Sequence, residues 1–158
     1  MGAMELDRNG IEVLSRGDSL SLLTTVPVGR IGLSMDALPV VLPVNYALDR
    51  ERERLVLRTA EGTKLRAALH GAVVAFEADH IDPFSHSGWS VLVRGSSSVL
   101  TDDRDIDVAR RLPLRPWANE RTDYWVSVSL DLVTGRRVRG WYDLHAPLAE
   151  TVASGSAV

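Results

Sequence analysis

Short apolar segments separated by turn residues recur along most of this chain, and they constrain its fold more than any other feature. Several of them alternate apolar and polar residues with period two, which is typical of half-buried β-strands. The connections are mostly hairpin-sized, which favours antiparallel pairing over a βαβ array. The expected strands are residues 19–26, 28–35, 40–48, 55–58, 72–78, 88–100 and 124–132, with a last basic strand at residues 136–139.

Helical patterns are fewer and shorter. Residues 6–16 are expected to form a small amphipathic helix that Gly17 ends, and residues 101–112 a second one with Thr101 or Asp102 as its N-cap. A third follows the strand at residues 55–58. Residues 79–87 are expected to form a polar loop. The stretch from Gly29 to Gly32 could begin a bulged strand, and Arg30 within it could also be a charged residue at the rim of a site. The sequence therefore predicts a mainly β (α+β) fold, an antiparallel barrel or half-barrel of six to seven strands with two or three short helices.

The chain of 158 residues is long enough for one domain with its own core, expected at residues 4–145. Residues 1–3, which precede Met4, resemble a leftover of expression, and residues 146–158 are small and aperiodic, as in a flexible C-terminal tail.

Composition excludes several functions. A formal net charge of −3 argues against a general nucleic-acid surface, and with zero cysteines there is no disulfide, thiolate nucleophile or cysteine-ligated metal. No apolar run or signal-peptide pattern indicates a membrane span or export, so a cytoplasmic location is expected. The four histidines lack metal-ligand spacing, and no G-x-S-x-G elbow is present. We therefore predict no metal site, and the sequence identifies no catalytic residue.

The segment at residues 55–69 carries the clearest chemical signal. Its first half alternates like a strand and its second half has helical spacing, with a turn at Glu61-Gly62-Thr63-Lys64 between them. A helix N-terminus presents unpaired backbone N–H groups and partial positive charge, which suits a phosphate. Arg58 and Lys64 would add two full charges, and Thr59 and Thr63 would add hydroxyl donors.

Lys64 is the only lysine in a chain with seventeen arginines. An ammonium group on a flexible stem differs chemically from a guanidinium, so its use at this turn favours a binding role. The alternative is a chance lysine on a solvated helix face. The segment is not a P-loop, because G-x-x-x-x-G-K-[ST] is absent.

Aromatic and polar residues on other strands could form a flat wall beside the phosphate. Pro43 interrupts a strand just before Asn45 and Tyr46, and Trp89 precedes Ser90 at a loop-to-strand junction. Trp117 could contribute, although a core or dimer contact is the better interpretation for Trp117, Trp125 and Trp141. A phosphate clamp next to a flat wall fits flavin mononucleotide (FMN) best, and the absence of G-x-G-x-x-G argues against a Rossmann dinucleotide site.

The chain resembles the pyridoxamine 5'-phosphate oxidase-like, FMN-binding split-barrel family over roughly residues 6 to 140. The order and spacing of several stretches carry this resemblance: Pro27-Val28-Gly29-Arg30-Ile31, Leu42-Pro43-Val44-Asn45-Tyr46, Leu57-Arg58-Thr59 with Gly62-Thr63-Lys64, Val74-Ala75-Phe76-Glu77 with Asp79, Gly88-Trp89-Ser90-Val91-Leu92-Val93-Arg94-Gly95, Pro116-Trp117 and Thr134-Gly135-Arg136-Arg137.

The resemblance implies a homodimer of split barrels with two flavin sites at the dimer interface. It implies that Arg58, Thr59, Thr63 and Lys64 hold the phosphate and ribityl chain. The remaining implied contacts are Pro43, Val44, Asn45 and Tyr46 along the isoalloxazine, Trp89 and Ser90 from the partner subunit, and Arg136 near the ring.

The longer C-terminal pattern and the substrate-phosphate arginines of true pyridoxamine phosphate oxidases are absent, so vitamin B6 oxidation is not expected. The first hypothesis is a flavin-dependent oxidoreductase of unknown small-molecule substrate, with FMN as cofactor and a deazaflavin as the alternative. The second is a non-catalytic flavin-binding sensor or carrier, and the third is a β-barrel interaction module without a cofactor. Because the flavin itself carries the redox chemistry, the lack of an acid–base motif does not exclude an enzyme.

Overall fold

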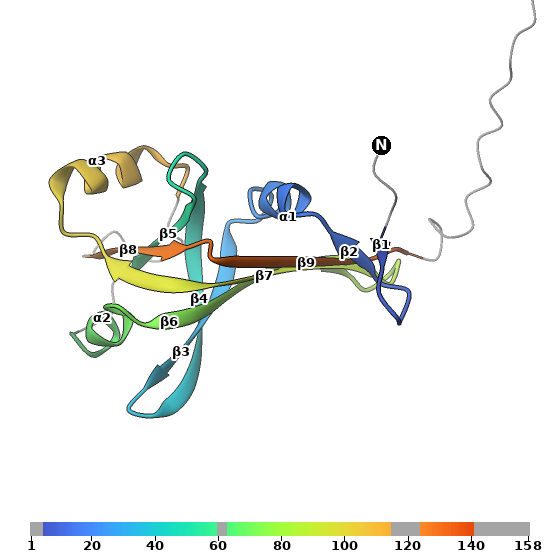
Figure 1. Cartoon of the computed structure of the whole chain (residues 1–158), viewed down its shortest axis with the longest axis horizontal. Helices are drawn as coiled ribbons and strands as arrows, with labels where there is room; N and C mark the ends of the chain where they lie inside the picture. Colours follow the sequence, from blue (N-terminus) through green and yellow to red (C-terminus); the bar gives the residue numbers. More distant parts are fainter. Residues whose placement is uncertain (1–4, 60–62, 115–123, 141–158) are drawn as a thin grey trace, which may run out of the picture.

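The computed structural model describes residues 5–59, 63–114 and 124–140, except for the side chains of Thr63, Lys64 and Arg66. Within them, nine strands form one antiparallel sheet system that curves into a barrel at one end, with three short helices around it (Figure 1). The elements are β1 (Glu5–Leu6), β2 (Glu12–Leu14), α1 (Arg16–Leu22), β3 (Val28–Met35), β4 (Leu38–Asp49), β5 (Arg54–Thr59), α2 (Thr63–Leu69), β6 (Val73–Asp82), β7 (Ser87–Val99), α3 (Asp103–Arg111), β8 (Tyr124–Ser129) and β9 (Leu132–Val138).

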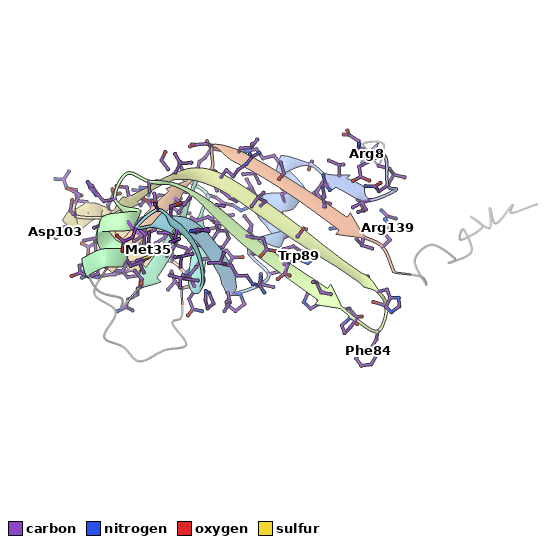
Figure 2. All side chains as sticks on the ribbon, turned by 90° about the horizontal axis from the view of Figure 1, so that it is seen from below. Arg8, Met35, Phe84, Trp89, Asp103 and Arg139 are labelled. Carbon is purple, nitrogen blue, oxygen red and sulfur yellow. The ribbon has the colours of Figure 1, made fainter. Side chains whose placement is uncertain are left out.

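The strand order is β1-β2-β9-β7-β6-β3-β4-β5-β8, and β8 also pairs with the end of β7. This second pairing, at Ser97 to Val99 of β7, closes one end of the sheet into a barrel. Strands β6, β7 and β9 continue beyond the barrel as a long ribbon (Figure 2). The prediction of a mainly β, antiparallel fold is confirmed.

The core is one cluster of aliphatic side chains around Phe76, which lies edge-on to Tyr46 with ring centroids 4.7 Å apart. Strand β5 is buried on both faces, and Leu55, Val56 and Leu57 are each at most 1% exposed. Leu65 and Leu69 of α2 belong to the same cluster, which is why the helical spacing at residues 65–69 was visible in the sequence.

The N-terminal predictions were wrong. In place of a helix at residues 6–16, the chain forms β1, a turn and β2 up to Leu14, because the Asp7 carboxylate accepts from the N–H groups of Asn9 and Ile11 and Gly10 has a φ of 75°. The predicted strand at residues 19–26 is instead helix α1 and the turn after it. Ser15 caps α1 by accepting from the Asp18 N–H, so Gly17 lies inside the helix and does not end it.

Three further details also differ from the sequence predictions. Strand β3 pairs with β4 in unbroken register from Val28 to Met35, so the predicted bulge is absent. Strand β6 runs on to Asp82 and β7 begins at Ser87, so only residues 83–86 of the predicted polar loop lie outside the strands. The sequence also predicts a turn at Thr134-Gly135 before the last strand, but both residues lie inside β9.

The sequence also predicts a charged hairpin turn at residues 49–53, which the structure confirms between β4 and β5. The predicted helix at residues 101–112 is confirmed as well, with Asp102 as its N-cap. None of the three helices in the described part has the length and apolar character needed to cross a bilayer. Residues 1–3, Trp117, Trp141 and residues 146–158 lie outside the described residues.

Candidate functional site

One face of the sheet is left uncovered by the helices, and we call it the open face. It consists of the side chains that project to one side from β4, β3, β6, β7 and β9. The register of these strands aligns Pro43, Arg30, Glu77, Leu92 and Thr134 in one row across the face, and Asn45, Val28, Asp79, Ser90 and Arg136 in the next. The open face carries exposed apolar side chains at Val13, Val41, Val73, Ile81, Leu92, Leu132 and Val138.

The four predicted isoalloxazine contacts on β4 divide between two faces. Strand alternation sends Pro43 and Asn45 to the open face and Val44 and Tyr46 toward the core. Asn45 donates from Nδ2 to the Pro27 carbonyl at 3.2 Å, which fixes the amide beside β3. Pro43 lies where β4 has β3 on one side only, since pairing with β5 starts at Tyr46, so its missing N–H removes no ladder bond there.

Tyr46 is a core residue. Its side chain is 4% exposed, and its hydroxyl donates to the Leu23 carbonyl at 2.7 Å. Burial raises the pKa of this hydroxyl well above its usual value, and the negative charge of Glu77 adds to the effect. Within one chain the Tyr46 side chain is therefore committed to the core, which leaves its backbone as the part that could border a ligand.

Arg58 and Thr59 end strand β5. Arg58 lies opposite Trp125 of β8, and its guanidinium carbon is 5.3 Å from the centroid of the indole ring. This cation–π contact orients a charged group without neutralising it. The β4–β5 pairing ends at Tyr46 and Leu57, so Asn45 and Arg58 are the first residues beyond its last pair. Two predicted cofactor residues from different strands thus become neighbours.

Residues 60–62, which the sequence predicts to belong to a turn, and the side chains of Thr63 and Lys64 lie outside the described part. Strand β5 ends at Thr59 and helix α2 begins at Thr63, so the predicted succession of a strand and a helix is confirmed. The proposed phosphate contacts of Thr63 and Lys64 remain predictions.

The other predicted residues lie on the ribbon. Ser90 pairs with Asp79 on one side and Arg136 on the other. Trp89 pairs with His80 and Arg137, so its indole and the Ser90 hydroxyl leave the strand in opposite directions, and Trp89 packs half-buried against the core. Arg136 is 62% exposed and comes within 3.6 Å of the Asp7 carboxylate.

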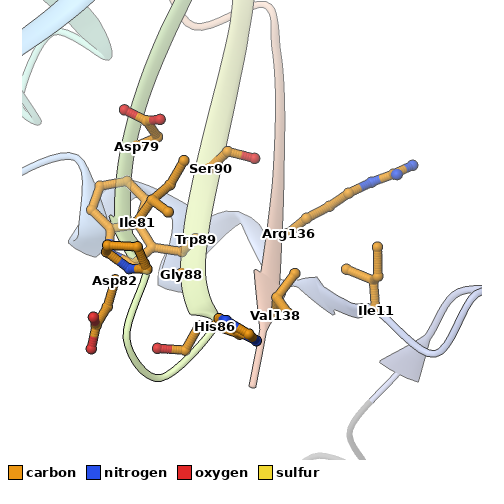
Figure 3. A pocket seen from close by; sticks show the side chains of 12 residues that line it. Ile11, Asp79, Ile81, Asp82, His86, Gly88, Trp89, Ser90, Arg136 and Val138 are labelled. Atoms are coloured by element: carbon orange, nitrogen blue, oxygen red, sulfur yellow. The ribbon is translucent and has the colours of Figure 1, made fainter. Parts of the chain in front are cut away.

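A cavity of about 600 Å³ opens at this end of the molecule, between the β6–β7 turn and β9 (Figure 3). Its volume lies in the range of small-molecule sites. Its apolar part is lined by Ile11, Ile81, Pro83, Trp89 and Val138, and the polar groups at its edge include Ser90, Arg136 and His86. His86 has a φ of 53°, an uncommon conformation for a residue other than glycine.

Within one chain the two groups of residues do not meet. Three strand spacings separate Asn45 on β4 from Ser90 on β7, which is about 14 Å across the face. The structure brings Asn45 together with Arg58, and Ser90 with Arg136, as two separate half-sites on one face.

The sequence reasoning missed the charged cluster between these half-sites. Arg30 donates from Nη1 to Glu77 Oε2 at 2.9 Å and to Asp79 Oδ1 at 2.8 Å. Both hydrogen bonds raise the pKa of Arg30 above its usual value, and the bond to Asp79 has the larger effect. The sequence does show that Glu77 and Asp79 alternate with the apolar Phe76 and Ala78 on β6. It does not show that this strand pairs with Arg30, which lies more than forty residues earlier in the chain. Among the described residues, no group of three or more His, Cys, Asp and Glu side chains is arranged to hold a metal ion.

Comparison with known proteins gives consistent relatives. The sequence profile described as pyridoxamine 5'-phosphate oxidase matches residues 15–137. The chain is 35% identical over 130 residues to the uncharacterized protein Rv0080 of Mycobacterium tuberculosis, covering 79% of this chain and 84% of that protein.

Solved structures agree with the sequence comparison. A FAD binding protein from Mycobacterium smegmatis is 38% identical with a TM-score of 0.70, covering 80% of this chain and 98% of that one. A protein of unknown function from Corynebacterium diphtheriae is 34% identical with a TM-score of 0.68, covering 80% and 96%. The split-barrel fold expected from the resemblance is thereby confirmed, and with a match across most of its length the chain belongs to the pyridoxamine 5'-phosphate oxidase family.

Proposed function

We propose that this protein is a homodimeric, flavin-dependent oxidoreductase that binds one flavin between the half-sites of two subunits. The observation that carries the proposal is the division of the predicted residues into two half-sites on one exposed face. Asn45 and Arg58 form one, and Ser90 and Arg136 the other. Asn45 and Arg58 present polar groups on one side only, whereas Ser90 and Arg136 border the cavity of about 600 Å³.

A second copy stacked on the open face would complete both sites at once. If a twofold axis runs in the interface, parallel to the strands and between β3 and β6, then β7 of each subunit lies over β4 of the other. Ser90 and Arg136 of the partner subunit would then face Asn45 and Arg58 of this one, and the symmetry would generate a second, identical site.

The open face has the size and composition that such a contact needs. Five strands about 4.8 Å apart and about eight residues long cover roughly 650 Å², close to the about 800 Å² per partner of a standard interface. Val41, Val73 and Ile81 are 67%, 80% and 67% exposed in the single chain, which is unusual for side chains of this kind unless a partner covers them.

The phosphate end of the cofactor is assigned to β5 and the start of α2. Arg58 would neutralise the phosphate charge, with Thr59, Thr63 and Lys64 as further donors, while Asn45 and the backbone of residues 43–46 border the ring. When bound, a flavin supplies hydride and electron transfer, and the protein orients it and excludes water. The cavity beside Ser90 and Arg136 would receive the substrate or the outer part of the cofactor.

FMN is the cofactor that we propose first. The relative from M. smegmatis is named as a FAD binding protein, which makes FAD the main competitor, and a deazaflavin remains the third possibility. We further propose that the protein is cytoplasmic and that its substrate is a small molecule.

A spectrum of the purified protein tests the proposal most directly. We expect a yellow preparation that absorbs near about 450 nm, and mass spectrometry of the released compound to identify FMN. A colourless protein that binds neither FMN nor FAD in a titration would contradict the flavin assignment. Oxidation of a reductant by the loaded protein then separates an enzyme from a carrier.

Variants of the phosphate end provide the residue-level test. Lys64→Ala and Arg58→Ala should each weaken flavin binding by about tenfold or more, because a charge-assisted contact to phosphate is lost. Arg58→Lys keeps the charge and should retain part of the affinity. Arg110→Ala, which removes an exposed arginine on α3, is the matched control and should have no effect. Equal affinities for all four proteins would exclude the assigned phosphate site.

A further inference from the structure

The cluster of Arg30, Glu77 and Asp79 lies midway between the two half-sites. Arg30 projects from β3 and the two acids from β6, the strands that separate β4 from β7. The side chains of Arg30, Glu77 and Asp79 are 50%, 32% and 24% exposed. Ion pairs this open contribute little to the stability of a single chain. Their place at the centre of the open face, between the two half-sites, therefore calls for another explanation.

The guanidinium of Arg30 keeps unused donors. Within the described part of the chain, both of its hydrogen bonds start from Nη1, and neither Nη2 nor Nε donates. A guanidinium has five N–H groups in a planar fork that fits carboxylates two bonds at a time. Arg30 thus has capacity for another carboxylate on the exposed side of the sheet.

The same twofold axis that joins the half-sites determines what this carboxylate would be. Arg30 lies directly opposite Glu77 in the register of β3 and β6. An axis parallel to the strands and between these two exchanges their positions, so Arg30 of one subunit comes over Glu77 of the partner subunit. The contact is self-complementary, as an isologous interface requires.

We propose that Arg30 of each subunit pairs with Glu77 and Asp79 of the partner subunit as well as with its own, forming an ion-pair network on the twofold axis that sets the register of the homodimer. This inference rests on the proposed function, since it uses the axis that completes the flavin sites. Covered by the partner, these charges are desolvated, and a misplaced register would leave them unpaired at a high cost.

The charges on the open face balance in such a dimer. Each subunit contributes two acids, Glu77 and Asp79, and one arginine from the cluster. Arg94 projects from the same face of β7, two residues beyond Leu92, and adds the second positive charge. Arg136 on the same face has its own partner in the Asp7 carboxylate at 3.6 Å. The remaining groups, two positive and two negative per subunit, carry no net charge, which favours close association of two identical surfaces.

Opposite charge variants test whether the pairing crosses between chains. Arg30→Glu leaves three acids in the cluster, and Glu77→Arg with Asp79→Arg leaves three arginines. We expect each variant alone to dimerise at least tenfold more weakly than the wild type, because like charges meet on the axis. An equimolar mixture should form heterodimers that native mass spectrometry separates by mass, with an affinity within about threefold of the wild-type dimer.

If the cluster pairs only within its own chain, mixing should not restore dimerisation, because each variant chain still contains charges of only one sign. Wild-type dimers that bind flavin, together with no heterodimer in the mixture, would overturn this inference while leaving the proposed function intact. A wild-type chain that binds flavin as a monomer would overturn both the dimer and the network.

The pair Asp107 and Arg110 on α3 is the control, with a distance of 3.0 Å and side chains that are 60% and 65% exposed. Asp107→Arg and Arg110→Glu should dimerise like the wild type, alone or mixed. Circular dichroism checks that the cluster variants are folded. If they are not, the milder Arg30→Gln and Glu77→Gln should still weaken the dimer at least threefold, and unchanged dimer affinity in both would equally overturn the network.

Discussion

Neighbouring residues on β4 serve different purposes, because a strand sends successive side chains to opposite faces. Asn45 reaches the open face next to Arg58, whereas Tyr46 enters the core and gives its hydroxyl to the Leu23 carbonyl. A short motif such as Pro43 to Tyr46 is therefore not a single binding unit. Its odd-numbered members can contact a ligand through their side chains, and its even-numbered members hold the strand against the barrel.

Tyr46→Phe should destabilise the protein without changing its flavin spectrum. The substitution leaves the buried Leu23 carbonyl without the donor that lies 2.7 Å away, which costs about 1–3 kcal/mol. Urea unfolding measures this loss as a lower midpoint at unchanged slope. A shifted flavin spectrum at unchanged stability would show that the hydroxyl serves the cofactor instead.

Gly29 and Gly32 on β3 should respond differently to the same substitution. A Cβ at Gly29 would collide with the Phe76 ring and lie 2.7 Å from the Glu77 carbonyl, whereas at Gly32 the nearest atom is 3.7 Å away. Gly29→Ala should therefore cost about 1–3 kcal/mol through overpacking, and Gly32→Ala should be tolerated. Thermal unfolding of the two variants compares them, and equal melting temperatures would contradict the packing at Phe76.

Elements differ in how they are held together. Helix α3 begins at a cap of its own, the Asp102 carboxylate, which accepts from the N–H groups of Arg104 and Asp105. Because this cap is a local feature, the start of the helix could be predicted from the sequence. Strands β6 and β7 depend on each other over ten residue pairs and end in a turn organised by Asp82. Asp82 accepts from the Ser85 hydroxyl at 2.6 Å and from the Phe84 N–H at 2.9 Å.

The β6–β7 turn should loosen in acid. The Ser85 hydroxyl, and next the Phe84 N–H, lower the pKa of Asp82 in the folded protein. A carboxyl with a lowered folded pKa stabilises the fold fully above its unfolded value, about 3.9, and this contribution disappears as the pH falls through the lowered pKa. The amide shift of Phe84 followed by NMR between pH 7 and acid should report the loss. Asp82→Asn cannot titrate and should give a flat curve, and a titrating curve in that variant would assign the change to another group.

At the scale of the whole molecule, the exposed apolar residues are not spread evenly. Most of them project from the open face, and the helix α1 covers the opposite side of β9, where a Cβ on Gly135 would collide with Ser19. Because helices cover one side of the sheet and apolar side chains are exposed on the other, this arrangement supports the proposed second subunit on the open face.

Two substitutions on opposite sides of β4, Val41→Asp and Leu38→Asp, test whether the open face is the dimer interface. Both residues are 67% exposed, but Val41 projects to the open face and Leu38 to the other side of β4. Val41→Asp should shift the dimer toward monomer at least tenfold and weaken flavin binding with it, because a charge is buried without a partner. Leu38→Asp should leave both unchanged. Sedimentation velocity with and without FMN measures the association, and monomerisation by Leu38→Asp alone would place the interface elsewhere.

Local features of the sequence predicted much of this fold. The period-two runs located β3, β4, β5, β7 and β8, the helical spacing located α2, and the capping acids located α3. The prediction failed at residues 6–26, where an Asx turn and a capped helix replaced a helix and a strand. Apolar residues in such short segments fit either period, and the packing of α1 on β9 decides between them.

The sequence alone determined which residue types are available to hold a phosphorylated, planar cofactor, and in which order the strands that carry them occur. Only the tertiary structure decided which of those residues share a face. Arg30 meets Glu77, and Ser90 meets Arg136, across strands that are distant in the chain. The physical reason is that periodicity is a property of one segment, whereas the face on which a side chain acts follows from the register between strands, which forms only when the whole sheet is assembled.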